Sequence, residues 1–134
     1  MKAKLAVVIA GIGLMVAAAP VTAHHSFAAE YNANKPVTLT GIVTRIEWTN
    51  PHAHFYIDVK DDKGKATSWN FELASPKVLT QSGWTGGSLH IGDEVTVEGA
   101  MAKDGSTMAN ARVVTLADGR RVSAGSSGGD VPPQ

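Results

Sequence analysis

The sequence predicts a mainly β protein, a small five-stranded Greek-key barrel of the OB type with one short helix between the third and fourth strands. Two observations predict this fold. Five segments have the β-branched or alternating pattern of strands, and a Ser-Pro pair that is typical of a helix start follows the third segment. A length of 134 residues is enough for one hydrophobic core. A small β-sandwich is the alternative architecture.

The expected strands cover residues 37–48, 54–59, 66–73, 94–100 and 108–116. The first is rich in β-branched residues, and Gly41 inside it predicts a bend or a bulge. Alternation in the second and third strands directs Phe55 and Phe71 into the core and leaves Glu72 on the outer face. Ser75, with a proline after it, predicts a helix cap and a helix over residues 76–82.

Residues 1–23 have the pattern of a signal peptide. Two lysines form a positive start, and residues 5–19 are an apolar stretch that is shorter than the roughly 20 residues needed to span a bilayer. A proline ends this stretch, and small residues occupy the positions that a signal peptidase reads. We therefore expect cleavage after Ala23, export to a bacterial periplasm, and no stable membrane anchor afterwards. His24 then becomes the mature N-terminus.

This prediction divides the rest of the chain into three parts. Residues 24–36 form an N-terminal segment and residues 37–123 form the barrel domain. Residues 124–134 contain Gly, Ser and Pro but no run that could build a core, so a disordered tail is expected.

Charge and cysteine content exclude several classes of function. The formal net charge is zero, and removal of the two leader lysines leaves 10 basic against 12 acidic residues. The basic surface of a nucleic-acid-binding protein is missing, so we expect no nucleic-acid partner. The chain has no cysteine, which excludes disulfides, thiolate metal sites and cysteine nucleophiles.

Four of the five histidines occur as two pairs. His24 and His25 begin the predicted mature chain, and His52 and His54 stand where the second strand begins. Residues two apart in an extended segment project to the same side, roughly 6.5–7 Å apart, which would allow two imidazoles to approach one ion. The alternative is that all four histidines are solvated polar residues that bind no metal.

A free amine and an imidazole on His24 could chelate a metal together, since both lose their protons near neutral pH. A third nitrogen from His52 or His54 would complete an all-nitrogen set, which suits Cu(II). This arrangement resembles the histidine brace of copper-binding exported proteins and copper monooxygenases. A competing geometry uses the amine, the intervening amide and the His25 ring, without the barrel. Glu30 and Glu72 are possible oxygen ligands.

Four motifs together resemble a family of small exported bacterial proteins of unknown function whose mature chains begin with HHSF. They are HHSFAAEY at residues 24–31, KPVTLTG at 35–41, EWTNPH at 47–52 and GDEVTVEG at 92–99. The resemblance implies export and a single small β-domain, and it brings no established activity. The family pattern suggests an aromatic or aliphatic residue where His54 stands, which makes His52 the safer ligand.

Two other functions compete with a copper carrier, buffer or resistance factor. One is a non-metal binding module for a peptide, a glycan or a partner protein, with Trp48 and Tyr56 as contacts. The other is an enzyme, a copper oxidase that uses the same brace. No second catalytic group or extended substrate surface stands out in the sequence, so a binding protein is expected and its protein partner is unknown.

Overall fold

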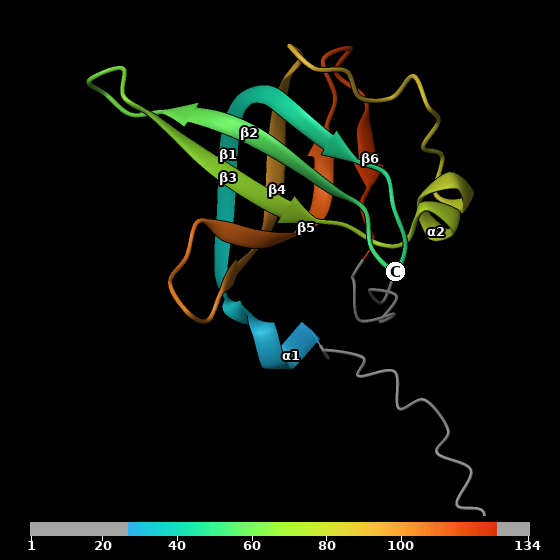
Figure 1. Ribbon diagram of the computed structural model, residues 1–134, viewed down its shortest axis with the longest axis horizontal. Coiled ribbons are helices and arrows are strands. Elements are labelled where there is room, and N and C mark those ends of the chain that lie inside the picture. Colours follow the sequence, from blue (N-terminus) through green and yellow to red (C-terminus); the bar gives the residue numbers. More distant parts are fainter. Residues whose placement is uncertain (1–26, 126–134) are drawn as a thin grey trace, which may run out of the picture.

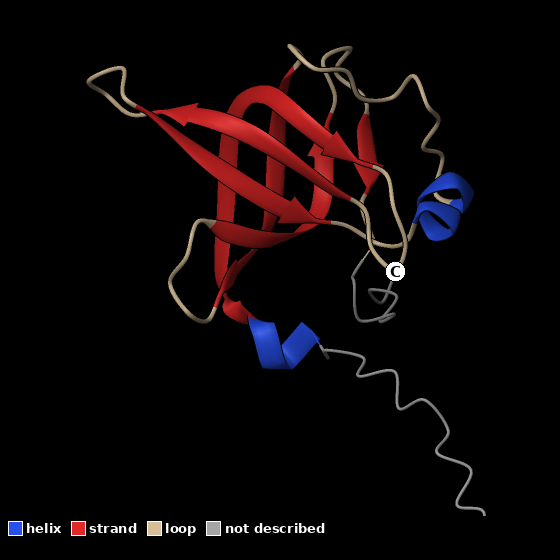
Figure 2. Ribbon diagram, viewed as in Figure 1, coloured by secondary structure: helices blue, strands red, loops and turns tan. Residues whose placement is uncertain are grey.

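The computed structural model describes residues 27–125, in which two short helices and six strands follow one another (Figure 1). The elements are α1 (Phe27–Glu30), β1 (Tyr31–Glu47), β2 (His54–Lys60), β3 (Ala66–Glu72), α2 (Pro76–Gln81), β4 (Glu94–Ala102), β5 (Met108–Thr115) and β6 (Arg121–Ser123). The strands form one curled sheet, and the two helices lie outside it (Figure 2).

The sheet closes on itself to form a barrel. Its strand order is β3-β2-β1-β4-β5-β6, and β3 also pairs with β5. All other pairings are antiparallel, whereas β3 and β5 run parallel through a short register that begins with Asn70 opposite Met108. Five strands therefore close the barrel and β6 extends it beyond β5. With α2 between β3 and β4, this is the OB-type barrel that the sequence predicts.

The first strand begins earlier than the sequence predicts, at Tyr31 instead of residue 37. Residues 31–36 (YNANKP) lack the β-branched pattern, but they continue β1 because Tyr31 pairs with Ala102 at the far end of β4. Tertiary pairing overrides local propensity here. The barrel thus includes part of the predicted N-terminal segment.

Gly41 lets two backbones approach closely. A Cβ atom on this residue would lie 2.4 Å from the carbonyl oxygen of Asp58 on β2. The bulge that accompanies the bend of β1 lies between Val43 and Arg45, just beyond the glycine.

The core fills the barrel and extends under α2. Phe55, Ile57 and Phe71 are at most 1% exposed, which confirms the predicted alternation. The other large, fully buried apolar side chains are Trp84, Leu73, Leu79, Val43, Val95, Val97 and Val114. A separate, smaller cluster of Tyr31, Ala100 and Ala102 packs against Phe27 and Met108 near α1.

The helix α2 begins where the sequence predicts. The Ser75 hydroxyl accepts a hydrogen bond from the Val78 backbone N–H, and Pro76 occupies the first turn. Trp84 follows the helix and donates from Nε1 to the Ser123 carbonyl at 2.8 Å, which ties this region to β6.

The predicted tail, residues 124–134, includes one residue that belongs to the folded domain. Ala124 is fully buried, its N–H donates to the Arg112 carbonyl, and its own carbonyl accepts from Ala74. It therefore belongs to the folded domain. The remainder of that tail, residues 126–134, lies outside the described residues, as does the predicted signal peptide. Within residues 27–125, neither helix has the length and apolar character needed to cross a bilayer.

Candidate functional site

A buried carboxylate joins two distant parts of the barrel. Glu72 is the last residue of β3, and its side chain is only 7% exposed. Its Oε2 accepts a hydrogen bond of 2.5 Å from the Tyr31 hydroxyl, and its Oε1 lies 3.0 Å from Nδ1 of His52. Both carboxylate oxygens therefore have a partner, as a buried charge requires.

The fold explains why these residues meet. The loop between β1 and β2 is held against the end of β3, because Ala53 donates to the Ala74 carbonyl and Leu73 donates to the Ala53 carbonyl. His52, directly before Ala53, is thereby placed beside Glu72. Tyr31, the first residue of β1, reaches the other oxygen of Glu72 with its hydroxyl.

One ring nitrogen of His52 faces Glu72: Nδ1 lies 3.0 Å from Oε1, and the His52 side chain is 28% exposed. A carboxylate accepts hydrogen bonds, so a neutral His52 ring that carries its proton on Nδ1 can donate it to Glu72 and keeps the lone pair of Nε2 for another partner. A histidine whose Nδ1–H donates to a carboxylate while Nε2 is available is a common arrangement among metal-binding histidines.

Tyr31 is a neutral donor held in a buried position. Burial raises the pKa of its phenol above the ordinary value of 10, and both the hydrogen bond to Glu72 and the negative charge of Glu72 act in the same direction. The Tyr31 ring also contacts the Phe27 ring at 5.7 Å between centroids. The first residue of α1 is therefore linked to the group of Tyr31, Glu72 and His52.

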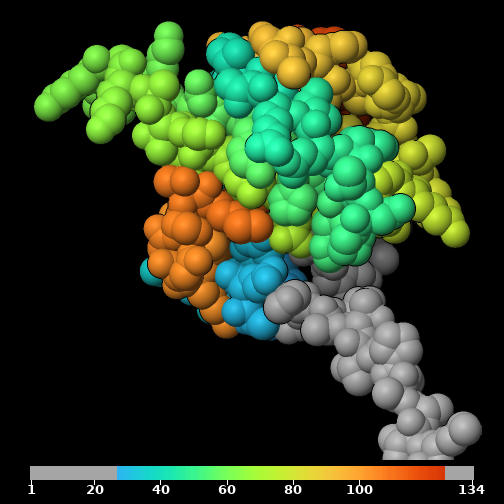
Figure 3. Space-filling view, in the orientation of Figure 1, coloured from blue at the N-terminus to red at the C-terminus, as the bar shows by residue number. Residues whose placement is uncertain are grey.

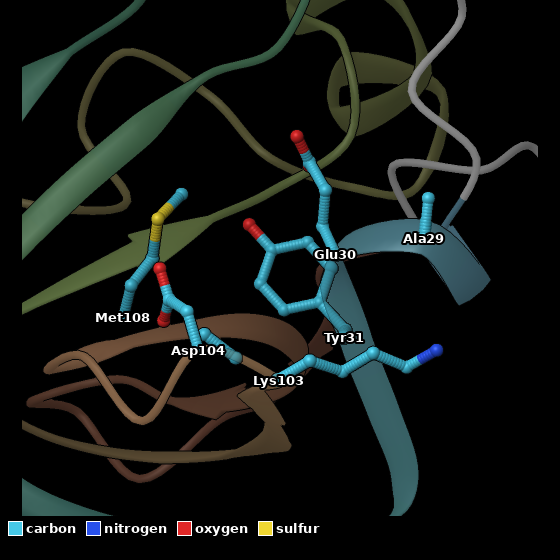
Figure 4. A pocket seen from close by; sticks show the side chains of 7 residues that line it. Ala29, Glu30, Tyr31, Lys103, Asp104 and Met108 are labelled. Carbon is cyan, nitrogen blue, oxygen red and sulfur yellow. The ribbon is translucent and has the colours of Figure 1, made fainter.

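A pocket of about 250 Å³ has Tyr31 in its wall and lies between α1 and the turn that joins β4 to β5 (Figure 4). The seven lining residues are Ala29, Glu30, Tyr31, Ala102, Lys103, Asp104 and Met108. In Figure 3 the blue surface of α1 lies directly beside the orange surface of this turn. The Lys103 side chain extends toward α1, where its ammonium group donates to the Ala28 carbonyl.

His52 and His54 are held separately. Their partners, Glu72 and Asn70, are successive outer-face residues of β3, and Nδ1 of His54 lies 2.9 Å from Oδ1 of Asn70. Among residues 27–125, no group of three or more His, Asp or Glu side chains is arranged to hold a metal ion. His24 and His25, the other predicted ligands, lie outside the described residues.

The predicted oxygen ligands occupy different places. Glu72 bonds to Tyr31 and His52 through its two oxygens, and Glu30 lines the pocket. The role of Tyr31 could not be predicted from the sequence, because nothing in its local pattern marks it as part of the sheet. The resemblance motif at residues 24–31 ends on this tyrosine, and that was the available signal.

The two aromatic residues predicted as partner contacts differ in their surroundings. Trp48 is 40% exposed, and its ring lies 6.0 Å from that of the buried Trp84. Tyr56 lies beneath the Arg45 guanidinium, whose carbon is 5.2 Å from the ring centroid. Trp48 therefore presents the larger accessible apolar surface of the two.

A family model described as a family of unknown function, DUF6152, matches residues 11–111. The chain belongs to this family. No curated protein matches the chain. Membership confirms the predicted resemblance to a family of unknown function, and it assigns no activity.

Two solved structures are similar in fold. The mitochondrial single-stranded DNA-binding protein Rim1 of S. cerevisiae is 13% identical, with a TM-score of 0.48 over 61% of this chain and 92% of the other. The N-terminal domain of PriB from Thermoanaerobacter tencongensis is 19% identical, with a TM-score of 0.43 over 62% and 96%. The likeness concerns the chain fold only.

Proposed function

We propose that the protein is exported and binds one copper ion through His24 and His52, as a carrier, buffer or resistance factor. The observation that carries this proposal is the bond between Glu72 and Nδ1 of His52, with the His52 ring still 28% exposed. Glu72 fixes the ring orientation and directs Nε2 outward as a ligand. Tyr31 in turn holds the other oxygen of Glu72.

Covalent geometry supports the participation of His24. Phe27 contacts Tyr31, whose hydroxyl bonds to the same carboxylate as His52. Three residues span at most about 10–11 Å when fully extended. Cleavage after Ala23 would therefore leave His24 only three residues before Phe27. Phe27 in turn contacts Tyr31, which bonds to the same carboxylate as His52.

The donor atoms favour copper. The amine and ring of His24 with Nε2 of His52 form an all-nitrogen set, and a site of this kind suits Cu(II). His25 and His54 are alternative ligands. His25 would replace His52 in a chelate made by the N-terminal residues alone, and His54 lies on the same face of the sheet as Glu72.

The test uses the mature protein that begins at His24, with its N-terminus verified by mass, and competition titration with Cu(II). We expect one copper per chain. Affinity should fall at least tenfold in His52→Ala and in a chain with one extra residue ahead of His24. His90→Ala is the matched control, because His90 is 64% exposed and faces Asp93 in a remote turn. Unchanged affinity and stoichiometry in the extended chain would show that the amine is not a ligand.

Export has its own test. Mass analysis of the protein from the periplasmic fraction should give a chain that starts at His24. A chain that retains residues 1–23, or accumulation in the cytoplasm, would refute the cleavage and the brace together.

One observation favours the competing binding module. A tryptophan that is 40% exposed and rests on a buried tryptophan is a rigid apolar contact surface. In this second candidate function, Trp48 contacts a peptide, glycan or protein partner and the histidines play no part.

A further inference from the structure

The ends of β2 and β3 project from the barrel as a hairpin, drawn in green in Figure 1. Residues 60–68 of this hairpin are all exposed. On one side β3 pairs with β2 along its whole length, and on the other side it pairs with β5 only from Asn70 onward. Within residues 27–125, no strand covers the first part of that second side. β3 therefore has an open edge where the hairpin leaves the barrel.

Hydrogen bonds show which backbone groups lie on the open edge. The Lys65 carbonyl accepts a hydrogen bond across the hairpin, so the odd-numbered residues here bond toward β2. Asn70 donates its N–H in the other direction, to the Thr107 carbonyl. Bonding directions alternate along a strand, so the N–H and C=O groups of Ala66 and Ser68 point away from β2, as those of Asn70 do. These groups form the open edge.

Residues 65–69 (KATSW) lack the features that protect most open edges. Natural sheets use proline, a bulge or a charged side chain within the edge to prevent further pairing. This segment has no proline, β2 and β3 pair in one continuous register, and the single charged residue, Lys65, stands at the end. Threonine and tryptophan also favour strands. The segment is therefore suited to pair with another strand.

A second copy of this chain fits the edge. When two copies pair antiparallel about a twofold axis at Thr67, Ser68 of each copy faces Ala66 of the other in a hydrogen-bonded pair. Every outward N–H and C=O group of these two residues then has a partner. Gly64 would stand opposite Asn70, where one hairpin turns and β5 of the other copy begins. The open edge and the strand that fills it thus have the same length.

The side chains of this edge are also complementary. The axis places Thr67 directly beside Thr67 of the second copy, a cross-strand pair that stabilises sheets. It places Lys65 opposite Trp69 of the second copy, so an ammonium group can lie against the half-buried indole. Like charges do not face each other along residues 65–69.

We infer that the protein forms a twofold homodimer in which the open edges of β3, residues 65–69, pair antiparallel about Thr67. The two barrels then share one continuous sheet through their hairpins. A strand from another protein would use the same backbone groups but would not provide the match of Lys65 with Trp69. This inference does not depend on copper binding.

A single introduced thiol tests the position of the axis, because the chain has no cysteine. In Thr67→Cys the two thiols stand in a directly opposed pair, within reach of a disulfide. Ser68→Cys is the matched control, since the axis offsets its two thiols by two residues, to roughly 7–8 Å. We expect diamide to cross-link the full chain at least about tenfold faster in Thr67→Cys than in Ser68→Cys. Equal rates, or no cross-link at residue 67, would overturn the inference.

Sedimentation equilibrium measures the dimer without a cross-link. The wild-type full chain should show twice the mass of one chain. Ser68→Pro removes an outward N–H but leaves the bonds to β2 intact, so its dissociation constant should rise at least about tenfold. Asp62→Pro is the control, because it places a proline in the turn of the same hairpin, outside the paired segment. A wild-type chain that is monomeric at every concentration would overturn the dimer.

Amide hydrogen exchange of the wild type keeps the test decisive if Ser68→Pro fails to fold. The amides of Ala66 and Ser68 should exchange more slowly as the protein concentration rises. Those of Thr67 and Trp69 bond to β2 and should not respond to concentration. Exchange at Ala66 and Ser68 that is equally fast at all concentrations would contradict pairing through this edge.

Discussion

The Tyr31 hydroxyl lies 2.5 Å from Oε2 of Glu72, across 41 residues of sequence. This hydrogen bond joins the first residue of β1 to the last residue of β3, and the same carboxylate bonds to His52. A single buried side chain thus links the start of the folded domain, the barrel wall and the loop before β2. It is the structural centre of the candidate site.

Removal of either partner of the Tyr31–Glu72 hydrogen bond should cost stability. Glu72→Ala leaves the Tyr31 hydroxyl buried without its acceptor, and we expect the free energy of unfolding to fall by about 1–3 kcal/mol. Tyr31→Phe leaves Oε2 of a buried carboxylate without its donor, and the expected loss is at least as large, because an unpaired charged group costs more than an unpaired neutral one. Urea unfolding of both variants and of the double variant measures these losses and their coupling. Additive losses would show that the two side chains are not coupled.

Alkaline pH should destabilise the protein through Tyr31. The folded state raises the pKa of this phenol above 10, so the contribution is fully present below pH 10 and is lost as the pH rises beyond it. In that range the unfolded chain releases a proton that the folded chain retains, with a slope of at most about 1.4 kcal/mol per pH unit from this residue.

The difference between wild type and Tyr31→Phe isolates this effect, because all other titrating groups are present in both. Urea unfolding from about pH 8 to about pH 11 should give a stability difference that is constant at first and shrinks above pH 10. A constant difference over the whole range would contradict the raised pKa of Tyr31.

The close approach of β4 and β5 should make Gly99 intolerant of a side chain. A Cβ at this position would lie 2.1 Å from the Asn110 carbonyl oxygen, so the two backbones must move apart. We expect Gly99→Ala to lower the free energy of unfolding by about 1–3 kcal/mol. Gly86→Ala is the control, since a Cβ there meets no atom within 4 Å. Equal stability of both variants would show that β4 and β5 are not tightly packed at Gly99.

Trp48→Ala distinguishes the copper protein from a non-metal binding module. We expect copper affinity to be unchanged, because Trp48 has no contact with Glu72 or His52 among its described interactions. Cu(II) titration and a pull-down from periplasmic extract are run in parallel on Trp48→Ala and His52→Ala. A partner lost with Trp48 and kept without His52, in a protein that binds no copper, would favour the module.

The barrel could be predicted because its strands alternate in a way that a half-buried sheet requires. The alternation alone predicts that Phe55 and Phe71 lie in the core, and the Ser75-Pro76 pair predicts the start of α2. The extension of β1 back to Tyr31 could not be predicted, since it depends on pairing with the end of β4, 71 residues further along.

Only part of the candidate site could be predicted from the sequence, for the same reason. His52 stood out by its spacing from His54, but alternation places Glu72 on an outer face that ought to be solvated. Glu72 is buried instead, and its carboxylate bonds to Tyr31, which belongs to the unexpected part of β1. Alternation along a strand predicts which face of the sheet a side chain lies on. It does not predict which distant residue will cover that face once the sheet curves into a barrel.

Electron paramagnetic resonance of the mature protein with one equivalent of Cu(II), compared with His52→Ala, tests the central claim most directly. The account predicts a single nitrogen-rich Cu(II) species in which one imidazole coupling disappears when His52 is replaced. An identical spectrum in His52→Ala would contradict it, because copper would then be held by the N-terminal residues without the barrel.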